Sequence, residues 1–75
     1  MVPMALLSIG EFARAARMSV KALRHYDALG VLVPAHVDPH SGYRRYERAQ
    51  LRDALLITLM RQADIGLPVV RSALA

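Results

Sequence analysis

One face of a short predicted helix carries basic side chains and no acidic one. At about 100° per residue, four residues of a helix beginning at Val20 share one arc: Lys21, Arg24, His25 and Ala28. Lysine and arginine bind phosphate, and arginine also forms paired hydrogen bonds with guanine. This face therefore predicts contact with nucleic acid; an ordinary solvated helix face is the alternative.

A second basic cluster, Tyr43-Arg44-Arg45-Tyr46, alternates aromatic and cationic character. In an extended strand Tyr43 and Arg45 share one side, and Arg44 and Tyr46 share the other. Such a segment could hold phosphates along the minor groove. The alternative is that the tyrosines pack across strands while the arginines face water.

The sequence lacks the patterns of catalytic or metal chemistry. There is no cysteine, and neither a phosphate-binding Walker loop nor a G-x-G-x-x-G segment occurs. The serines have no convincing His/Asp context, and the histidines fall on different predicted elements: Ser8, Ser19, Ser41 and Ser72; His25, His36 and His40. We therefore expect no enzyme activity, no cofactor and no metal.

Length and composition limit the classes of protein to which the chain can belong. The chain has 75 residues, 55% hydrophobic and 21% charged, which predicts one small folded domain over residues 1–75 with a thin core. Ten basic against six acidic residues give a net charge of +4, which favours a polyanionic partner. No apolar run reaches the ~18 residues of a membrane span. The segment Met1 to Leu7 is short and lacks the basic flank of a signal peptide, so we expect none. We expect a cytoplasmic, nucleoid-associated protein with no membrane partner.

Two capping signals define the first two helices. Ser8 and Glu11 have the spacing of a capping box, which predicts a helix over 9–16. Ser19 is the next N-cap residue and predicts a helix from Val20 to about Leu29. Two short helices joined by a tight turn are typical of a helix-turn-helix.

Gly30 ends the second helix, and a hairpin should follow it. The β-forming runs 31–37 and 43–46 flank a cluster of turn-forming residues at 38–42. A hairpin of this size is not stable alone, so it must lean on the helices as a wing.

Two more helices complete the expected fold. The third should start at Glu47 or Arg48 and run to about Ala63, and Gly66 should break it. Pro68 suits the first turn of a fourth helix. The predicted fold is mainly α: a winged helix-turn-helix of about four helices with a two-stranded β-hairpin wing.

Asp27 is the one acidic residue on the apolar side of the second helix, between Val20 and Leu23. A carboxylate in that place needs a partner, because burying an unpaired charge is costly. We predict that it pairs with Arg44 or Arg45 of the hairpin.

The third predicted helix is more apolar than a thin domain can cover. It carries a stripe at i+4 spacing and further apolar residues beside it: Leu51, Leu55 and Leu59; Ala54, Leu56, Ile57 and Met60. The surplus indicates a partner surface, and a central helix wrapped by its neighbours is the alternative.

Several segments together resemble the MerR family of bacterial transcription regulators. They cover nearly the whole chain: Ser8–Ala13 as the opening, Met18–Leu32 as the recognition helix and its exit, Ser41–Tyr46 as the wing, and Gly66–Pro68 before the fourth helix. Val37–Pro39 is similar to the multidrug-sensing branch. His25, where the family often has an aromatic residue, and Ser72, where an apolar one is common, depart from the pattern.

The resemblance implies a function and a longer protein. Family members bind a promoter operator as homodimers and distort its DNA, which aligns the promoter for RNA polymerase. They continue into a dimerising helix and an effector-binding domain, so we expect residues 1–75 to be the N-terminal DNA-binding domain, monomeric or weakly associated when alone. The expected DNA-binding residues, of which Arg61 comes from the resemblance alone, are these: Lys21, Arg24, His25, Tyr26, Tyr43, Arg44, Arg45 and Arg61.

Two other classes stay open on sequence grounds. A small excisionase-like or architectural factor would bend DNA without an effector domain. A protein-interaction module would leave the basic face without a nucleic-acid partner.

Overall fold

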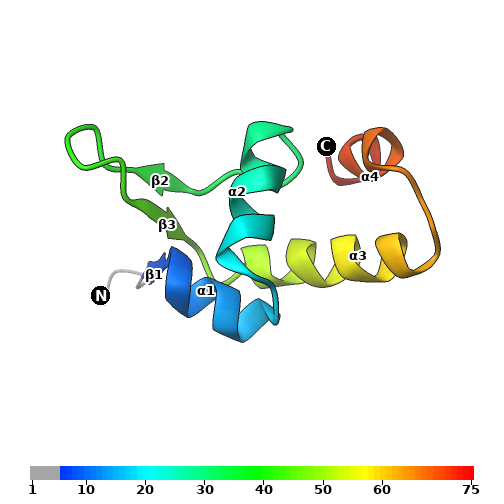
Figure 1. Cartoon of the computed structure of the whole chain (residues 1–75), viewed down its shortest axis with the longest axis horizontal. Coiled ribbons are helices and arrows are strands. Elements are labelled where there is room, and N and C mark those ends of the chain that lie inside the picture. The colour runs from blue at the N-terminus through cyan, green and yellow to red at the C-terminus, as the bar shows by residue number, and fades with distance from the viewer. Residues whose placement is uncertain (1–5) are drawn as a thin grey trace.

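A computed structural model describes residues 6–75 of the chain. The elements follow in the order β1 (Leu7–Ser8), α1 (Ile9–Ala16), α2 (Val20–Ala28), β2 (His36–Val37), β3 (Arg44–Tyr46), α3 (Gln50–Gln62) and α4 (Leu67–Leu74). Helix α2 stands across the start of α3, with the β2–β3 hairpin on one side of it and α4 on the other (Figure 1). The predicted winged helix-turn-helix, mainly helical with four helices, is confirmed.

The sheet is larger than the predicted two-stranded hairpin. It has three antiparallel strands in the order β1-β3-β2, and Leu7 lies opposite Tyr46. The first hairpin strand is also shorter than the expected run, because Val31 and Leu32 lie in a loop and are buried in the core. A two-residue strand beside a capping box gives no pattern of its own, so only its partner strand reveals it.

The predicted helix starts are confirmed atom by atom. The Ser8 amide donates to a Glu11 carboxylate oxygen at 2.8 Å, and the Glu11 amide donates to the Ser8 hydroxyl at 3.1 Å. The Ser19 hydroxyl accepts from the Ala22 amide at 3.0 Å. Helix α2 ends at Ala28, one residue before the expected end, and Gly30 follows with a φ of 70° that favours glycine.

Replacing Ser8 by alanine should destabilise the domain by about 0.5–2 kcal/mol, because α1 loses the hydroxyl that accepts from the Glu11 amide. The Ser8 amide, and then its hydroxyl, hold the pKa of the Glu11 carboxyl below its usual value. The capping box therefore stabilises the fold above the ordinary glutamate pKa, and this contribution is lost as pH falls through the lowered pKa. Urea unfolding at neutral and acid pH measures both effects.

The control for this prediction is Ser72→Ala. Ser72 is exposed in α4, and none of the hydrogen bonds found over residues 6–75 involves its side chain. Equal stability losses in the two variants would show that the capping box contributes nothing.

Helix α3 begins later than predicted. Its first α-helical residue is Gln50, and the preceding chain from Glu47 to Ala49 forms a turn that is tighter than a turn of α-helix. No serine, threonine or aspartate caps this end, so the Gln50 side chain reaches back and accepts from the Glu47 amide at 2.9 Å. For α4 the prediction holds: Gly66 is the N-cap residue, and Pro68 lies in the first turn.

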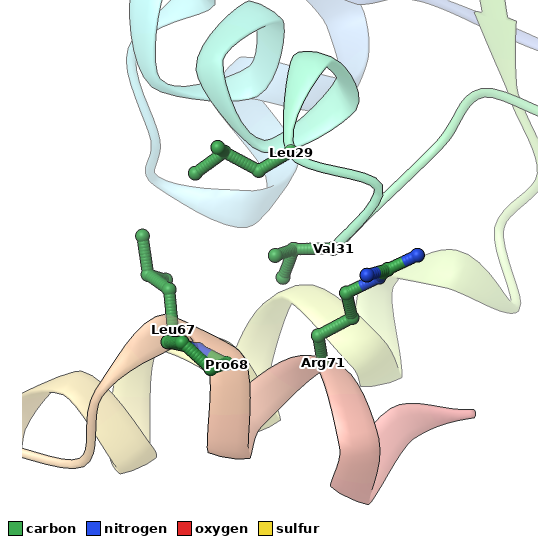
Figure 2. A pocket seen from close by; sticks show the side chains of 5 residues that line it. All are labelled: Leu29, Val31, Leu67, Pro68 and Arg71. Carbon is green, nitrogen blue, oxygen red and sulfur yellow. The ribbon is translucent and has the colours of Figure 1, made fainter.

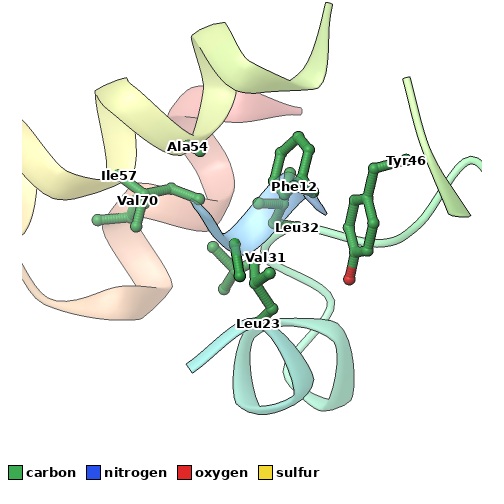
Figure 3. Close-up of a cluster of buried hydrophobic side chains, with 9 residues drawn as sticks. Phe12, Leu23, Val31, Leu32, Tyr46, Ala54, Ile57 and Val70 are labelled. Carbon is green, nitrogen blue, oxygen red and sulfur yellow. The ribbon is translucent and has the colours of Figure 1, made fainter. Parts of the chain in front are cut away.

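Each of the four helices and strand β3 contributes one large side chain to the core. The five largest fully buried side chains are Phe12 of α1, Leu23 of α2, Tyr46 of β3, Ile57 of α3 and Val70 of α4 (Figure 3). Phe12 and Tyr46 stack with ring centroids 4.4 Å apart and an interplanar angle of 18°. Because Tyr46 belongs to β3, this stack fixes the hairpin to the helix-turn-helix.

Some of the many apolar side chains of α3 are buried and others are exposed. Ala54 and Ile57 are buried in the core, as expected of a central helix. Leu55 and Leu59 are 58% and 51% exposed, respectively, and so remain uncovered.

Candidate nucleic-acid interface

The expected basic face of α2 is open to solvent. Lys21, Arg24, His25 and Ala28 are all exposed, whereas Leu23 on the opposite side is fully buried. The Ser19 cap fixes the start of the helix and therefore the rotation of this face about the helix axis. We call Lys21, Arg24 and His25 the α2 basic face.

Tyr26 stands apart from the α2 basic face. It is half-buried and packs against the core, and its carbonyl accepts from the Val31 amide at 2.8 Å. Its ring lies 6.0 Å from that of His25, measured between centroids, with the two planes tilted by 47°. Tyr26 thus links the basic face to the core, and its expected contact with DNA remains a prediction.

The hairpin alternates as the sequence predicts. Tyr43 is 68% exposed and Arg45 is exposed, while Tyr46 is fully buried and Arg44 half-buried. Burial raises the pKa of the Tyr46 hydroxyl, and the charge of Asp27 adds to this. Of these four residues, Tyr43 and Arg45 are the exposed ones.

Asp38 shapes the tip of the hairpin. Its carboxylate accepts from the amides of Ser41 and His40 at 2.9 and 2.8 Å, and these two bonds lower the pKa of the Asp38 carboxyl. Gly42 closes the turn with a φ of 76°. The carboxylate of Asp38 thus accepts hydrogen bonds from backbone amides of the same loop.

The predicted partner of Asp27 is present. The Arg44 Nε donates to the Asp27 carboxylate at 2.8 Å, with side chains 32% and 22% exposed, respectively. This contact ties the hairpin to α2, as the sequence predicted, and selects Arg44 over Arg45.

Arg61 is not brought together with the other expected residues. It is exposed near the end of α3, and its guanidinium donates to the Ile65 carbonyl at 3.0 Å. That end of α3 points away from the hairpin (Figure 1). Its role therefore rests on the resemblance alone and remains a prediction.

Three surface hollows lie around these elements. One of about 280 Å³ sits between the start of α1 and the hairpin, lined by Ser8, Ile9, Gly10, Tyr43, Arg44 and Arg45. We call it the wing hollow; sequence reasoning missed it, because it forms between segments far apart in the chain.

The other two hollows are, like the wing hollow, mainly apolar. One of about 180 Å³ lies where Leu29 and Val31 face α4 (Figure 2). One of about 340 Å³ lies between the end of α1 and α3, beside exposed Leu55.

Neither a metal nor a membrane site emerges from the described part of the chain. Over residues 6–75 no three His, Cys, Asp or Glu side chains gather where they could hold a metal ion. Within the same range, no helix has the length and apolar character needed to cross a membrane.

Comparison with known proteins decides the family. The model of the MerR family regulatory proteins matches residues 8–46, which include the helix-turn-helix and the hairpin. The chain belongs to the MerR family. This membership accounts for the segments Ser8–Ala13, Met18–Leu32 and Ser41–Tyr46, on which the resemblance was based.

Several MerR regulators are similar to this chain. The transcriptional regulator BrlR of Pseudomonas aeruginosa is 40% identical over 65 residues, which are 87% of this chain and 24% of BrlR. The multidrug-efflux transporter 1 regulator of Bacillus subtilis is 44% identical over 62 residues, 83% of this chain and 22% of that protein. The chain thus spans about a quarter of the length of these relatives, and it resembles the multidrug branch.

A solved structure gives the same fold together with nucleic acid. The cryo-EM structure of an EcmrR–DNA complex in EcmrR-RPo superposes with a TM-score of 0.76 at 37% identity, covering 79% of this chain and 22% of that one. The winged helix-turn-helix is therefore a family fold, and DNA is the ligand recorded for that relative.

Proposed function

We propose that this chain binds double-stranded DNA sequence-specifically, as the DNA-binding domain of a MerR regulator that distorts promoter DNA. The α2 basic face carries the proposal: two exposed cationic side chains, Lys21 and Arg24, share one surface of a helix with exposed His25, and none of these three residues is acidic. A helix of this kind fits the major groove, where base edges can be read.

The residues divide between reading bases and binding phosphates. Arg24, exposed at the middle of α2, is the candidate for a paired hydrogen bond to guanine. Lys21 and Arg45, both exposed, suit phosphate contacts, which orient the protein without reading sequence. His25 and Tyr43 supply flanking contacts to base or sugar.

Regulation requires more than residues 1–75. The relatives are about four times as long, which supports the proposal that dimerisation and effector sensing are supplied by other parts of an intact protein. As a homodimer that protein would deform its operator and act on RNA polymerase through the DNA. We place it in the cytoplasm at the nucleoid, with no enzyme activity and no cofactor.

An electrophoretic mobility shift with a random-sequence duplex library tests the proposal. At low salt the chain should retard duplexes, and repeated selection should enrich a common sequence. Absence of any shift would favour a protein-interaction module. A shift without sequence enrichment would favour an architectural DNA-bending factor instead.

Salt should weaken the complex strongly. If about four of the basic residues neutralise phosphates, the slope of log affinity against log salt should be roughly −3 to −4, at about −0.9 for each contact. Lys21→Ala should reduce the slope by about 0.9 and weaken all duplexes to a similar extent. Fluorescence anisotropy over a salt series measures both quantities, and a slope near zero would mean that the charge serves only solubility.

A further inference from the structure

We infer that Asp27, an acidic residue, strengthens DNA binding by positioning Arg44 for a backbone phosphate. The inference rests on the proposed function and adds a residue that does not itself touch DNA. It concerns the Asp27–Arg44 pair, which joins α2 to β3.

The contact leaves most of the guanidinium free. Asp27 engages Arg44 through Nε at 2.8 Å, and no hydrogen bond over residues 6–75 involves the two terminal nitrogens. A guanidinium carries five N–H groups in a rigid plane, so four of them remain for a second partner. Because one carboxylate oxygen holds the inner nitrogen, the orientation of this plane is fixed before a ligand arrives.

The surroundings of Arg44 favour an anion as that second partner. Arg44 lies beside Arg45 on β3, and its side chain is 32% exposed, so an anion can reach it from outside. The nearby Glu11 carboxylate already accepts from the Ser8 amide.

Two consequences make a fixed Arg44 a better phosphate ligand than a free one. A free arginine side chain loses much conformational freedom when it binds, and Asp27 removes that freedom in advance. The same contact holds the hairpin at a set position relative to α2, so the α2 basic face and the hairpin can engage one duplex together. Simple electrostatics predicts the opposite sign, because a carboxylate near DNA repels phosphate.

The test compares Asp27→Asn with Asp64→Asn, which removes the same charge elsewhere. Asp64 is exposed after α3 and has a φ of 60°, a conformation that asparagine also adopts. The probe is the duplex enriched by the wild-type chain. We expect Asp27→Asn to bind roughly three- to tenfold more weakly with a salt slope smaller by about 0.9, and Asp64→Asn to bind as tightly as the wild type or slightly more tightly.

Epistasis shows whether Asp27 acts through Arg44, and the salt slope shows whether a phosphate contact is lost. In an Arg44→Ala background, Asp27→Asn should cause no further loss of affinity, because the residue it positions is absent. Arg44→Lys keeps the charge but not the planar donor set, so it should also weaken binding. This second variant decides the matter should Asp27→Asn fail to fold, as judged by circular dichroism.

The outcomes separate the inference from the proposed function. A wild-type chain that binds the duplex, with Asp27→Asn binding equally or more tightly, overturns the inference and leaves the proposed function intact. A further loss in the Arg44→Ala background, or full affinity of Arg44→Lys, also overturns it. A wild-type chain that binds no duplex refutes the proposed function, and the inference with it.

Discussion

Arg24→Ala should weaken binding of the selected duplex by about 1–3 kcal/mol, which is roughly a 5- to 150-fold loss. Arg24 is exposed on the α2 basic face, where its planar guanidinium can pair with one guanine. The loss should be confined to duplexes that carry this base, so specificity should relax at one position. Titrations of duplexes substituted at each position, with fluorescence anisotropy as the readout, measure this effect.

Lys21→Ala is the matched comparison for Arg24→Ala. Both side chains are exposed on α2 and both carry one positive charge, so removal of either lowers the net charge equally. We expect Lys21→Ala to weaken all duplexes evenly and to leave the sequence preference unchanged. Unchanged affinity in both variants would show that the α2 basic face does not contact DNA.

Phe12→Ala should have the largest effect on stability, about 3–5 kcal/mol. Phe12 is fully buried, and its ring stacks on Tyr46 at 4.4 Å between centroids. A single core in a chain of this size supplies only about 3–5 kcal/mol in all, so the variant should be largely unfolded at room temperature. Urea unfolding followed by circular dichroism measures the loss.

Tyr43→Ala is the control for Phe12→Ala. Tyr43 is 68% exposed, so removing its ring should change the free energy of unfolding by no more than about 0.5 kcal/mol. A cooperative, near-normal unfolding transition for Phe12→Ala would contradict the role given to the stack with Tyr46. It would mean that the hairpin is held to the helices by other contacts.

Local signals explain which parts of the fold were predictable. Ser8, Ser19 and Gly30 act on neighbouring backbone groups, so the helices they bound were found to within a residue. Strand β1 was missed, because it exists only through pairing with β3, far away in the sequence. The start of α3 was placed too early, because a glutamine side chain replaces the usual cap at Glu47.

The candidate site, like the fold, could be predicted from the sequence only in part. Helical periodicity alone showed that Asp27 needed a partner, and the structure supplies Arg44. Periodicity could not reveal the wing hollow, which joins the start of α1 to β3 across the sequence. Arg61 was included through the family pattern alone and lies near the end of α3, and Tyr26 of α2 is half-buried, so neither belongs to the α2 basic face.

Nuclear magnetic resonance titration of the isotope-labelled chain with the selected duplex tests the central claim most directly. Backbone amide shifts report which surface meets DNA, residue by residue, without any substitution. The account predicts that the largest changes occur along α2 around Arg24 and along the hairpin around Arg45, with small changes on the exposed side of α3 at Leu55 and Leu59. Changes centred on that side of α3, with α2 unaffected, would contradict it.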